Sequence, residues 1–256
     1  MPERLYIVID RNAEGPDVLP FRTCMGDPVH PVALRAEHHI WSFTGLVDER
    51  YVDGIYIPDG RLARQVHGYQ MYMRTPTGYA DTLWYDRETG VPRGCDSAYD
   101  AMCDMLVPAT LGKKDVMAAV LGTGRMASAA VAALYPVCLY LNVVTRGNSP
   151  TEDDIDTVVG HIAGENGKPT CAVEYVGYGT AALGAMDIVV NATPVPLGTL
   201  VPGFTPAEGQ YVLDLAEDRG NAFRAARYCK VISRWTEPTT PEYLGYMEKL
   251  RNLFNG

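Results

Sequence analysis

The sequence predicts an α/β protein in which an N-terminal α/β domain precedes a second domain with a doubly wound parallel sheet. Three observations support this fold class. Short apolar and aromatic runs of strand length alternate with segments of helical spacing. A glycine turn at 122–127 separates an apolar run from an alanine-rich segment. The chain has 256 residues, 47% hydrophobic and 21% charged, enough for one large or two small cores.

The first part of the chain contains both strand-like and helix-like segments. β-branched and aromatic residues predict strands at 5–9, 51–57, 70–73 and 82–86. Apolar residues at helical spacing predict helices at 33–43 and 60–68. All ten basic residues before position 104 are arginines, and the first lysines are Lys113 and Lys114. We therefore end the first domain at 104.

The second part repeats the order strand, turn, helix, strand. The expected segments are a strand at 115–122, a helix at 127–135, and strands at 138–145, 185–192 and 211–216. They predict a doubly wound domain over 105–240. The last stretch, 241–254, has the pattern of an amphipathic helix with Pro241 in its first turn. Its apolar face can pack on either domain, and we assign residues 241–256 to the first domain.

The glycine turn has the spacing of a dinucleotide-binding fingerprint, G-x-G-x-x-A. Gly122 permits the tight turn, Gly124 lets a pyrophosphate approach the backbone, and Ala127 lets helix and strand pack closely. The pyrophosphate is expected on the free N–H groups at the start of the helix. The predicted cofactor-binding residues of this turn are Gly122, Thr123, Gly124, Arg125 and Met126.

The end of the next predicted strand indicates which dinucleotide is bound. An acid about 20 residues after the glycines favours NAD, whereas an arginine favours the 2′-phosphate of NADP. This chain has Thr145 and Arg146 there and no acid before Glu152. The cofactor is therefore predicted to be NADP(H), with Thr145 and Arg146 holding the 2′-phosphate. The alternative is that Arg146 is a solvated loop residue.

Charge and cysteine content exclude several classes of protein. The net charge of −9 leaves no basic surface for a nucleic acid or an anionic membrane. The six cysteines are scattered and never form C-x-x-C, so we expect reduced thiols and a cytoplasmic location. No run of 18 apolar residues is present, and the start has no leader pattern.

Five segments in order resemble the motifs of the shikimate dehydrogenase family. Segment 26–39 is similar to G-D-P-V-x-H-S-x-S-P-x-x-H-N, and segment 78–98 is similar to G-A-x-N-T-L followed by a short hairpin and G-x-N-T-D. Segments 122–134, 144–148 and 191–198 are similar to G-x-G-G-A-A/S-x-A, N-R-T and N-A-T-P-x-G, in that order. The resemblance implies a substrate-binding first domain, a Rossmann-type NADP-binding second domain, and Asn191, Ala192 and Thr193 beside the nicotinamide.

The chain departs from these motifs where the family handles its substrate. The family's catalytic lysine has no counterpart, because no lysine precedes Lys113. Its catalytic aspartate aligns with Ala98, and its two substrate-binding serines align with Val32 and Leu34. Shikimate is therefore not the expected substrate.

Other residues of the first domain are candidates for proton transfer and substrate binding. A redox reaction at a carbonyl or alcohol needs an acid or base near the reacting oxygen. Asp96 is the first choice, with His38 and Tyr72, although His38 matches a structural histidine of the family. The candidate substrate-binding residues are Arg35, Arg74 and Asp81. One interpretation is that Arg35 replaces the lost serines by binding a substrate carboxylate with two hydrogen bonds. The alternative is that Arg35 is a solvated residue on a helix.

Asp81 replaces an asparagine of the family motif, and its carboxylate suggests an amino or imino substrate. Adjacent His38 and His39 point about 100° apart on a helix, so no metal site is predicted. We expect an NADP-dependent dehydrogenase or reductase of specialised metabolism, acting on a small polar molecule, with a homodimer as one option. One alternative is a sensor or regulatory protein that binds NADP(H) without catalysis. Another is an enzyme that uses the dinucleotide-binding glycine turn for a reaction other than redox chemistry.

Overall fold

The structure is a computed structural model that describes residues 5–11, 29–33, 40–69, 75–147, 152–166, 171–179, 181–216 and 219–235. The chain divides into two compact units. The first unit comprises Met1–Ser97 and Arg227–Gly256, and the second comprises Ala98–Ala226. The divisions fall inside helices α4 (Ser97–Leu106) and α8 (Arg219–Trp235).

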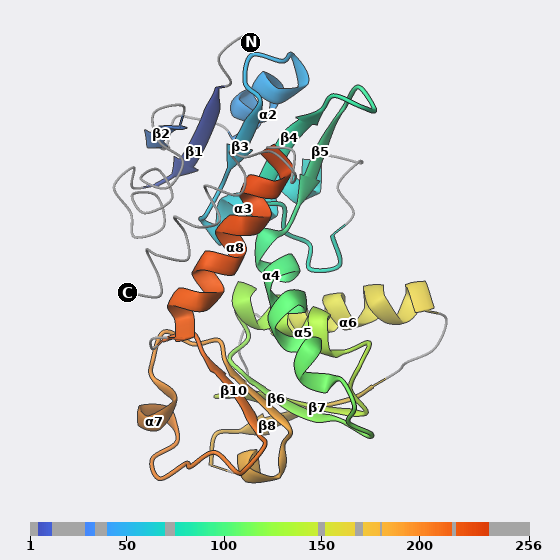
Figure 1. Ribbon diagram of the computed structural model, residues 1–256, viewed down its shortest axis with the longest axis vertical. Helices are drawn as coiled ribbons and strands as arrows, with labels where there is room; N and C mark the ends of the chain where they lie inside the picture. Colours follow the sequence, from blue (N-terminus) through green and yellow to red (C-terminus); the bar gives the residue numbers. More distant parts are fainter. Residues whose placement is uncertain are drawn as a thin grey trace. The chain divides into compact units, whose positions relative to one another are not determined.

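The first unit contains a mixed five-stranded sheet in the order β2-β1-β3-β4-β5 (Figure 1). Its strands are β1 (Tyr6–Asp10), β2 (Val29–Ala33), β3 (Gly54–Tyr56), β4 (Thr82–Asp86) and β5 (Val91–Cys95). The first three strands pair in parallel, and β4 pairs antiparallel with both β3 and β5. The expected hairpin is therefore present as β4–β5.

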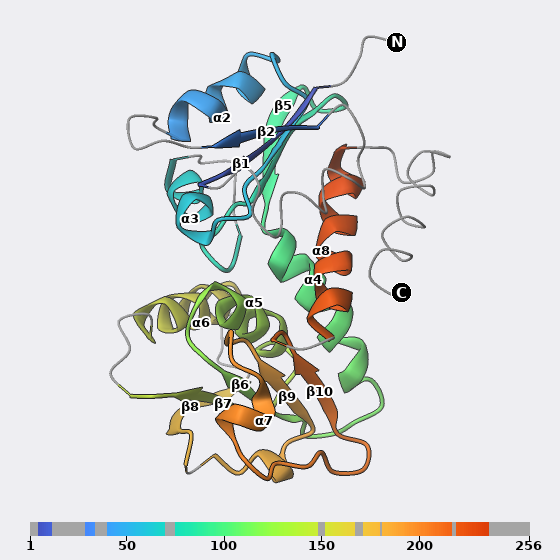
Figure 2. The same ribbon diagram turned by 90° about the vertical axis from the view of Figure 1, so that its left-hand side faces the viewer.

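Helices cover both faces of this sheet (Figure 2). On one face, Ile7 and Ile9 pack with helices α2 (Ile40–Asp48) and α3 (Gly60–Tyr69). On the other face, Tyr6 and Val8 pack with the second half of α8. Trp235 of α8 stacks on Tyr6 with ring centroids 4.5 Å apart. Gly54 makes room for it, since a Cβ there would lie 2.4 Å from the indole nitrogen.

The second unit contains an all-parallel sheet in the order β10-β9-β6-β7-β8. Its strands are β6 (Met117–Leu121), β7 (Tyr140–Thr145), β8 (Ala172–Gly177), β9 (Ile188–Asn191) and β10 (Tyr211–Asp214). The chain winds outward from β6 to β8 and then returns to β9 on the other side of β6. The strand order therefore reverses between β6 and β9, as in a doubly wound Rossmann-type fold.

The core of the second unit has two layers. Helices α5 (Arg125–Leu134) and α6 (Glu152–Asn166) pack on one face together with α4. The short helix α7 (Leu197–Leu200) and two 3₁₀ turns, Leu183–Ala185 and Pro108–Thr110, complete the unit. Leu183 and Leu197 pack on the opposite face, where Figure 1 also shows α7.

Helix α2 ends in a Schellman motif with an arginine in the left-handed position. Tyr51 N–H donates to the carbonyl of Leu46 at 2.8 Å, and Arg50 N–H donates to the carbonyl of Val47 at 3.1 Å. Arg50 has φ +61°, a conformation usually reserved for glycine at this position. An L-residue there costs about 1 kcal/mol more than glycine.

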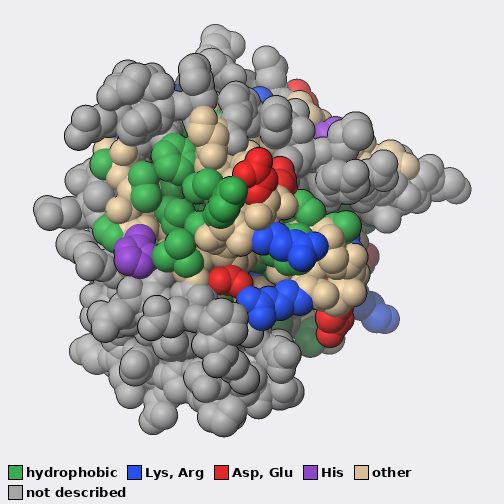
Figure 3. All heavy atoms as spheres, turned by 90° about the horizontal axis from the view of Figure 1, so that it is seen from above, with side chains coloured by type: hydrophobic (Ala, Val, Ile, Leu, Met, Phe, Trp, Pro, Cys, Tyr) green, Lys and Arg blue, Asp and Glu red, His purple; other side chains and the backbone are tan. Residues whose placement is uncertain are grey.

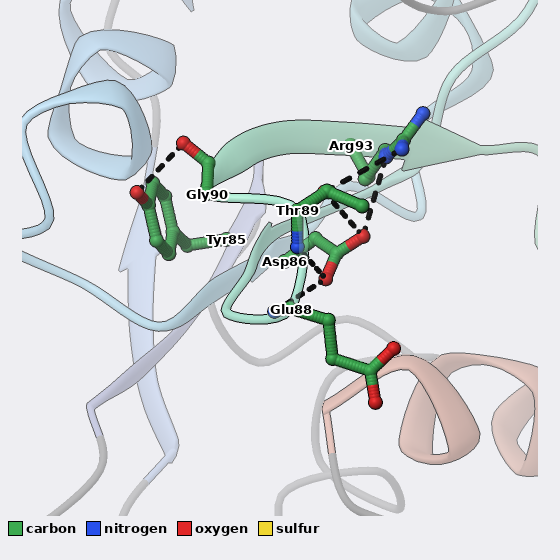
Figure 4. A network of polar contacts seen from close by, with 6 residues as sticks. All are labelled: Tyr85, Asp86, Glu88, Thr89, Gly90 and Arg93. Atoms are coloured by element: carbon green, nitrogen blue, oxygen red, sulfur yellow. Dashed lines mark hydrogen bonds and ion pairs between the residues drawn. The ribbon is translucent and has the colours of Figure 1, made fainter.

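The turn of the β4–β5 hairpin is held by the carboxylate of Asp86 (Figure 4). It accepts hydrogen bonds from the hydroxyl of Thr89 at 2.7 Å and from the backbone N–H of Glu88 at 3.0 Å. At the other side of the turn, the hydroxyl of Tyr85 donates to the carbonyl of Gly90 at 2.8 Å.

The predicted fold class is confirmed, but two element boundaries are wrong. The helix expected at 33–43 starts too early, because Ala33 pairs with Asp10 at the end of β2 and α2 is Ile40–Asp48. The strand expected at 51–57 is only Gly54–Tyr56, because Tyr51 and Val52 complete the end of α2. The strand expected at 70–73 and the helix expected at 241–254 lie outside the described residues.

Candidate functional site

The glycine turn lies between β6 and α5 and contacts the turn that follows β9. Gly122 has φ +104°, and its N–H donates to the carbonyl of Val144 at 2.9 Å. A Cβ at Gly122 would lie 3.2 Å from Cγ2 of Thr193 and 3.5 Å from the carbonyl oxygen of Ala192. The two turns therefore meet at the carboxyl ends of neighbouring parallel strands, where such sheets bind ligands.

The start of α5 has the properties of an anion-binding terminus. Gly124 is the residue before the helix, and a Cβ added to it would have nothing within 4 Å. Arg125 is the first helical residue, and Thr123 and Arg125 are buried. Ala127 is fully buried against the sheet, as the predicted close packing requires. The helix start thus combines N–H donors, a basic side chain and room at Gly124.

Asn191 organises the turn after β9 and is itself fully buried. Its side-chain amide N–H₂ donates to Asp214 Oδ1 and to the carbonyl of Val195, both at 2.7 Å. Its Oδ1 accepts from the N–H of Thr193 at 3.1 Å and from the hydroxyl of Thr193 at 2.8 Å. Asp214 Oδ2 also accepts from the N–H of Leu197 at 2.7 Å. Asn191 therefore shapes the turn, while Ala192 and Thr193 form the surface beside Gly122.

Thr145 and Arg146 lie at the carboxyl end of β7. Thr145 is buried, and its hydroxyl accepts from the N–H of Gly147 at 3.2 Å. Arg146 is exposed. The register pairs Thr145 with Gly177 of β8, so Tyr178 follows at the same edge of the sheet. Burial raises the pKa of Tyr178, and the positive charge of Arg146 opposes that rise.

Asp81 forms the centre of a buried ionic network in the first unit. The carboxylate is 0% exposed. Its Oδ1 accepts from the N–H of Ser97 at 2.8 Å and the hydroxyl of Thr82 at 2.8 Å. Its Oδ2 accepts from the hydroxyl of Ser97 at 2.6 Å and from Nη2 of Arg227 at 2.9 Å. These four donors occupy the lone-pair positions of the carboxylate.

Arg227 reaches this network from α8. Its Nε donates to the hydroxyl of Ser97 at 3.1 Å, and its side chain is 6% exposed. The guanidinium carbon lies 5.4 Å from the centre of the Tyr56 ring, in a cation–π arrangement. The charge of Asp81 is thus balanced inside the protein by Arg227.

Asp96 lies next to this network, between the end of β5 and α4. Its side chain is almost fully buried, and its Oδ2 accepts from the hydroxyl of Thr77 at 2.6 Å. Asp81 N–H donates to the carbonyl of Cys95, the residue before Asp96, at 3.0 Å. The β4–β5 pairing therefore brings Asp81 and Asp96, predicted from separate motifs, to the same end of the hairpin.

The structure places most of the predicted cofactor residues together and leaves part of the predicted substrate site undescribed. The residues at 122–126, Thr145, Arg146 and 191–193 all lie at or directly after the carboxyl ends of β6, β7 and β9. Asp81 and Asp96 lie together at one end of the β4–β5 hairpin. Four candidates lie outside the described residues: Arg35, His38, Tyr72 and Arg74.

Sequence reasoning missed Arg227, Ser97 and Asp214. Asp214 lies within the strand predicted at 211–216 and is the last residue of β10, so the available signal was a polar residue after an apolar run. Arg227 lies 146 residues from Asp81, so no local pattern connects the two. Ala98, which aligns with the family's catalytic aspartate, is fully buried in the core with α4.

Metal-binding clusters and membrane-spanning helices are both absent from the described ranges. No group of three or more His, Cys, Asp or Glu is arranged there to hold a metal ion. None of the described helices is long and apolar enough to cross a membrane.

Comparisons with known proteins give matches to solved structures. No protein-family model matches the chain, and neither does any curated protein sequence. Quinate dehydrogenase from Corynebacterium glutamicum, in complex with NAD, is 15% identical, covers 98% of this chain and 99% of its own, and gives a TM-score of 0.72. A shikimate dehydrogenase in complex with NADP⁺ is 14% identical, with 98% and 96% coverage and a TM-score of 0.69.

A third match acts on a different substrate. The ligand-free 5-ketofructose reductase of Gluconobacter sp. strain CHM43 is 14% identical, covers 99% of this chain and 100% of its own, and gives a TM-score of 0.69. Identities this low establish the fold alone. The resemblance predicted from the motifs is confirmed at that level: the chain has the fold of shikimate and quinate dehydrogenases.

Proposed function

We propose that this chain is an NADP(H)-dependent oxidoreductase acting on a small polar molecule other than shikimate. The contact between the glycine turn and the Asn191 turn carries the proposal. It lies where the strand order reverses between β6 and β9, the position at which doubly wound sheets bind dinucleotides. The solved structures of this fold named above include complexes with NAD and with NADP⁺.

The residues present fit a dinucleotide. The left-handed Gly122 turn and the open space at Gly124 leave the backbone accessible to a pyrophosphate. The residues expected to hold the pyrophosphate are Gly122, Thr123, Gly124, Arg125 and Met126. Thr145 and Arg146 are expected to hold the 2′-phosphate. Ala192 and Thr193 are expected to contact the nicotinamide, and Asn191 shapes their turn. A bound nicotinamide supplies hydride transfer.

The preference for NADP(H) rests on Arg146. An arginine at the end of β7, with no carboxylate between it and Glu152, favours a 2′-phosphate over a free hydroxyl. Replacing Arg146 by Ala should weaken NADPH binding about 10- to 100-fold, the value of a charge-assisted contact. NADH affinity should stay unchanged. Lys114→Ala is the matched control, because Lys114 is an exposed cation before β6, at the opposite end of that sheet.

Asp96 is our proposed proton-transfer group, with His38 and Tyr72 as the other candidates. Its carboxylate is held by Thr77, which fixes its orientation. A buried, oriented carboxyl group is suited to exchange a proton with a hydroxyl or carbonyl oxygen. Asp96→Asn should abolish turnover while leaving NADPH affinity intact. Retained turnover would remove Asp96 from this role.

The substrate class follows from what the first unit keeps and lacks. The lysine and aspartate of the shikimate motifs are absent, and Val32, at one lost serine position, packs against the core. Arg35, Arg74 and Asp81 stay the proposed substrate-binding residues. An amino group at Asp81 would compete with Arg227 for the carboxylate. Imines and amines belong in the substrate screen beside ketones and alcohols because Asp81 puts a carboxylate where the family motif has an asparagine.

A sensor that binds NADP(H) without catalysis is the second candidate. The buried Ala98 in place of the family's catalytic aspartate favours it. NADPH absorbance, followed against panels of ketones, imines and alcohols, separates the two. An enzyme consumes NADPH with at least one panel member, whereas a sensor binds NADPH and consumes none.

A further inference from the structure

A pocket of about 460 Å³ opens at the turn end of the β4–β5 hairpin. Its lining comes from the end of α2, the start of β3 and the hairpin: Arg50, Val52, Asp53, Tyr85, Arg87 and Gly90. Asp81 and Asp96 flank the opposite end of the hairpin. The register pairs Thr82 with Cys95 and Asp86 with Val91, so four residue steps, about 13 Å of strand, separate the two ends. The pocket is therefore distinct from the site described above.

One wall of the pocket is an ion pair in which the charge of Arg87 is neutralised by Asp53. Nη2 of Arg87 lies 2.6 Å from Asp53 Oδ1. Asp53 Oδ2 also accepts from the N–H of Leu5 at 3.0 Å. These contacts fix Arg87 beside the pocket and neutralise Asp53, the acid among the described residues of its lining.

The other wall carries the positive charge of Arg50. The guanidinium carbon of Arg50 lies 4.4 Å from the centre of the Tyr85 ring. Tyr85 is itself fixed through its hydroxyl bond to Gly90. Within the described ranges, no carboxylate lies within ion-pair distance of Arg50. Among the described residues, the lining thus holds two arginines and one acid, a positive excess in a protein of net charge −9.

The backbone at Arg50 adds an independent observation. The residue has φ +61° in the Schellman motif, where glycine is the favoured residue. A cation does benefit from the carbonyl end of a helix, but positions within the last turn give that benefit without a left-handed backbone. Outliers of this kind often mark functional positions. The outlier here places a guanidinium at the mouth of the pocket.

We infer that this pocket binds a small molecule through an oxyanion, a phosphate or a carboxylate group, held by Arg50 with Arg87 beside it. Guanidinium groups bind both oxyanions with two parallel hydrogen bonds. The excess positive charge attracts an anion, and Tyr85 keeps the Arg50 guanidinium in place. Figure 3, in which the molecule is seen from above, shows basic side chains beside acidic ones. The inference is independent of the dinucleotide site.

The test uses the full chain and three salts at equal ionic strength. Inorganic phosphate and citrate are the probes for phosphate and carboxylate groups, and sodium chloride is the reference. Backbone NMR signals of residues 50–53 and 85–90 report binding at this pocket and separate it from anions bound at α5. We expect saturable shifts with phosphate or citrate and none with chloride.

Arg50→Gly is the decisive variant, because glycine adopts φ +61° without strain and the fold should persist. It should weaken the probe at least about tenfold. Arg93→Ala is the matched control: it removes one positive charge from the same hairpin, but Arg93 bonds to Asp86 on the other side of the turn (Figure 4). It should bind the probe as the original chain does. Unsaturable shifts, unchanged binding by Arg50→Gly, or an equal loss in Arg93→Ala would each overturn the inference.

Discussion

The candidate sites of the two units are built from different kinds of contact. In the second unit, the Asn191 turn is closed by hydrogen bonds between residues two and four positions apart, with Asp214 added from β10. In the first unit, Asp81 is bound by Ser97, 16 residues away, and by Arg227, 146 residues away. One site depends mainly on backbone conformation and the other on a buried pair of charges.

This difference explains why the sequence matches the shikimate dehydrogenase motifs more closely in the second unit than in the first. Turns impose small residues and amides at fixed spacing, so the dinucleotide motifs persist in order. A buried carboxylate instead needs compensating donors, which any nearby segment can supply. In the first unit an aspartate replaces the asparagine of the motif, and Arg227 of α8 compensates its charge. The residues around position 81 are therefore free to change while the fold stays the same.

The largest effect is expected from removing one partner of the buried pair. Asp81→Ala leaves the guanidinium of Arg227 buried without its counter-charge, which should lower the free energy of unfolding by about 3–5 kcal/mol. Urea denaturation measures the change. The double variant Asp81→Ala/Arg227→Met should cost less than the sum of the two single variants, because it removes both charges. Additive losses would show that the two side chains do not stabilise each other.

The second effect concerns the glycine turn. Gly122→Ala puts a Cβ 3.2 Å from Thr193 at φ +104°, so it should cost about 1–3 kcal/mol of stability and also weaken NADPH binding. Gly124→Ala meets no atom within 4 Å, so it should leave stability unchanged and weaken NADPH alone. Urea denaturation and NADPH titration separate the two outcomes. Equal stability losses in both variants would contradict the described geometry.

Gly160→Ala supplies the control for both glycine variants. Gly160 lies within α6 and its added Cβ also has nothing within 4 Å. Alanine there should stabilise the helix by about 0.5–1 kcal/mol and leave NADPH binding unchanged.

Sequence patterns predicted the second unit better than the first for a physical reason. Its strands β6, β7, β9 and β10 are buried along most of their length, so they appear as apolar runs, and Gly122 and Gly124 lie between such a run and a helix. The partly exposed edge strand β8 lacks such a run and was not predicted. In the first unit, β2 contains a proline and ends at Ala33, inside the stretch predicted to be helical. Helix α8 packs through Tyr228, Val231 and Trp235, yet no helix was predicted at 219–235. Arg227 was missed because only the folded chain brings it to Asp81.

The third effect is a loss of stability in alkali that belongs to the second unit. Burial raises the pKa of Cys138 to about 12 and that of Cys171 to about 11. In the unfolded chain both thiols ionise near their ordinary value of 9.0, so the unfolded state loses protons first. Stability is therefore intact below that pH and falls as the pH rises towards the folded values. At pH 10 the loss should be about 1 kcal/mol per thiol.

Urea denaturation between pH 8 and pH 10.5 measures this fall. The variant Cys138→Ala/Cys171→Ala should be less stable at pH 8, because two buried side chains are truncated, but its stability should change less with pH. The same slope in both proteins would show that other groups cause the alkaline loss.

The smallest effect is a loss of stability in acid that belongs to the first unit. Hydrogen bonds from the hydroxyl and the backbone of Thr89 lower the pKa of Asp86, with smaller help from Glu88 and Arg93. A lowered pKa stabilises the fold above the ordinary value of 3.8, and this stabilisation is lost as the pH falls through the folded value. The direction is opposite to that of the two cysteines. Because Asp86 lies in an exposed turn, solvent screens the effect.

The pKa of Asp86 itself gives the sharper measurement, by NMR titration of its carboxyl carbon. Thr89→Val removes the strongest donor and should raise the pKa most, whereas Arg93→Ala removes a bond of 3.4 Å and should raise it least. The reverse order would mean that the charge of Arg93, rather than the turn, sets the acidity of Asp86. In that case the hairpin would depend on a charge pair, as the Asp81 network does, and the first unit would use one kind of contact at both ends of the β4–β5 hairpin.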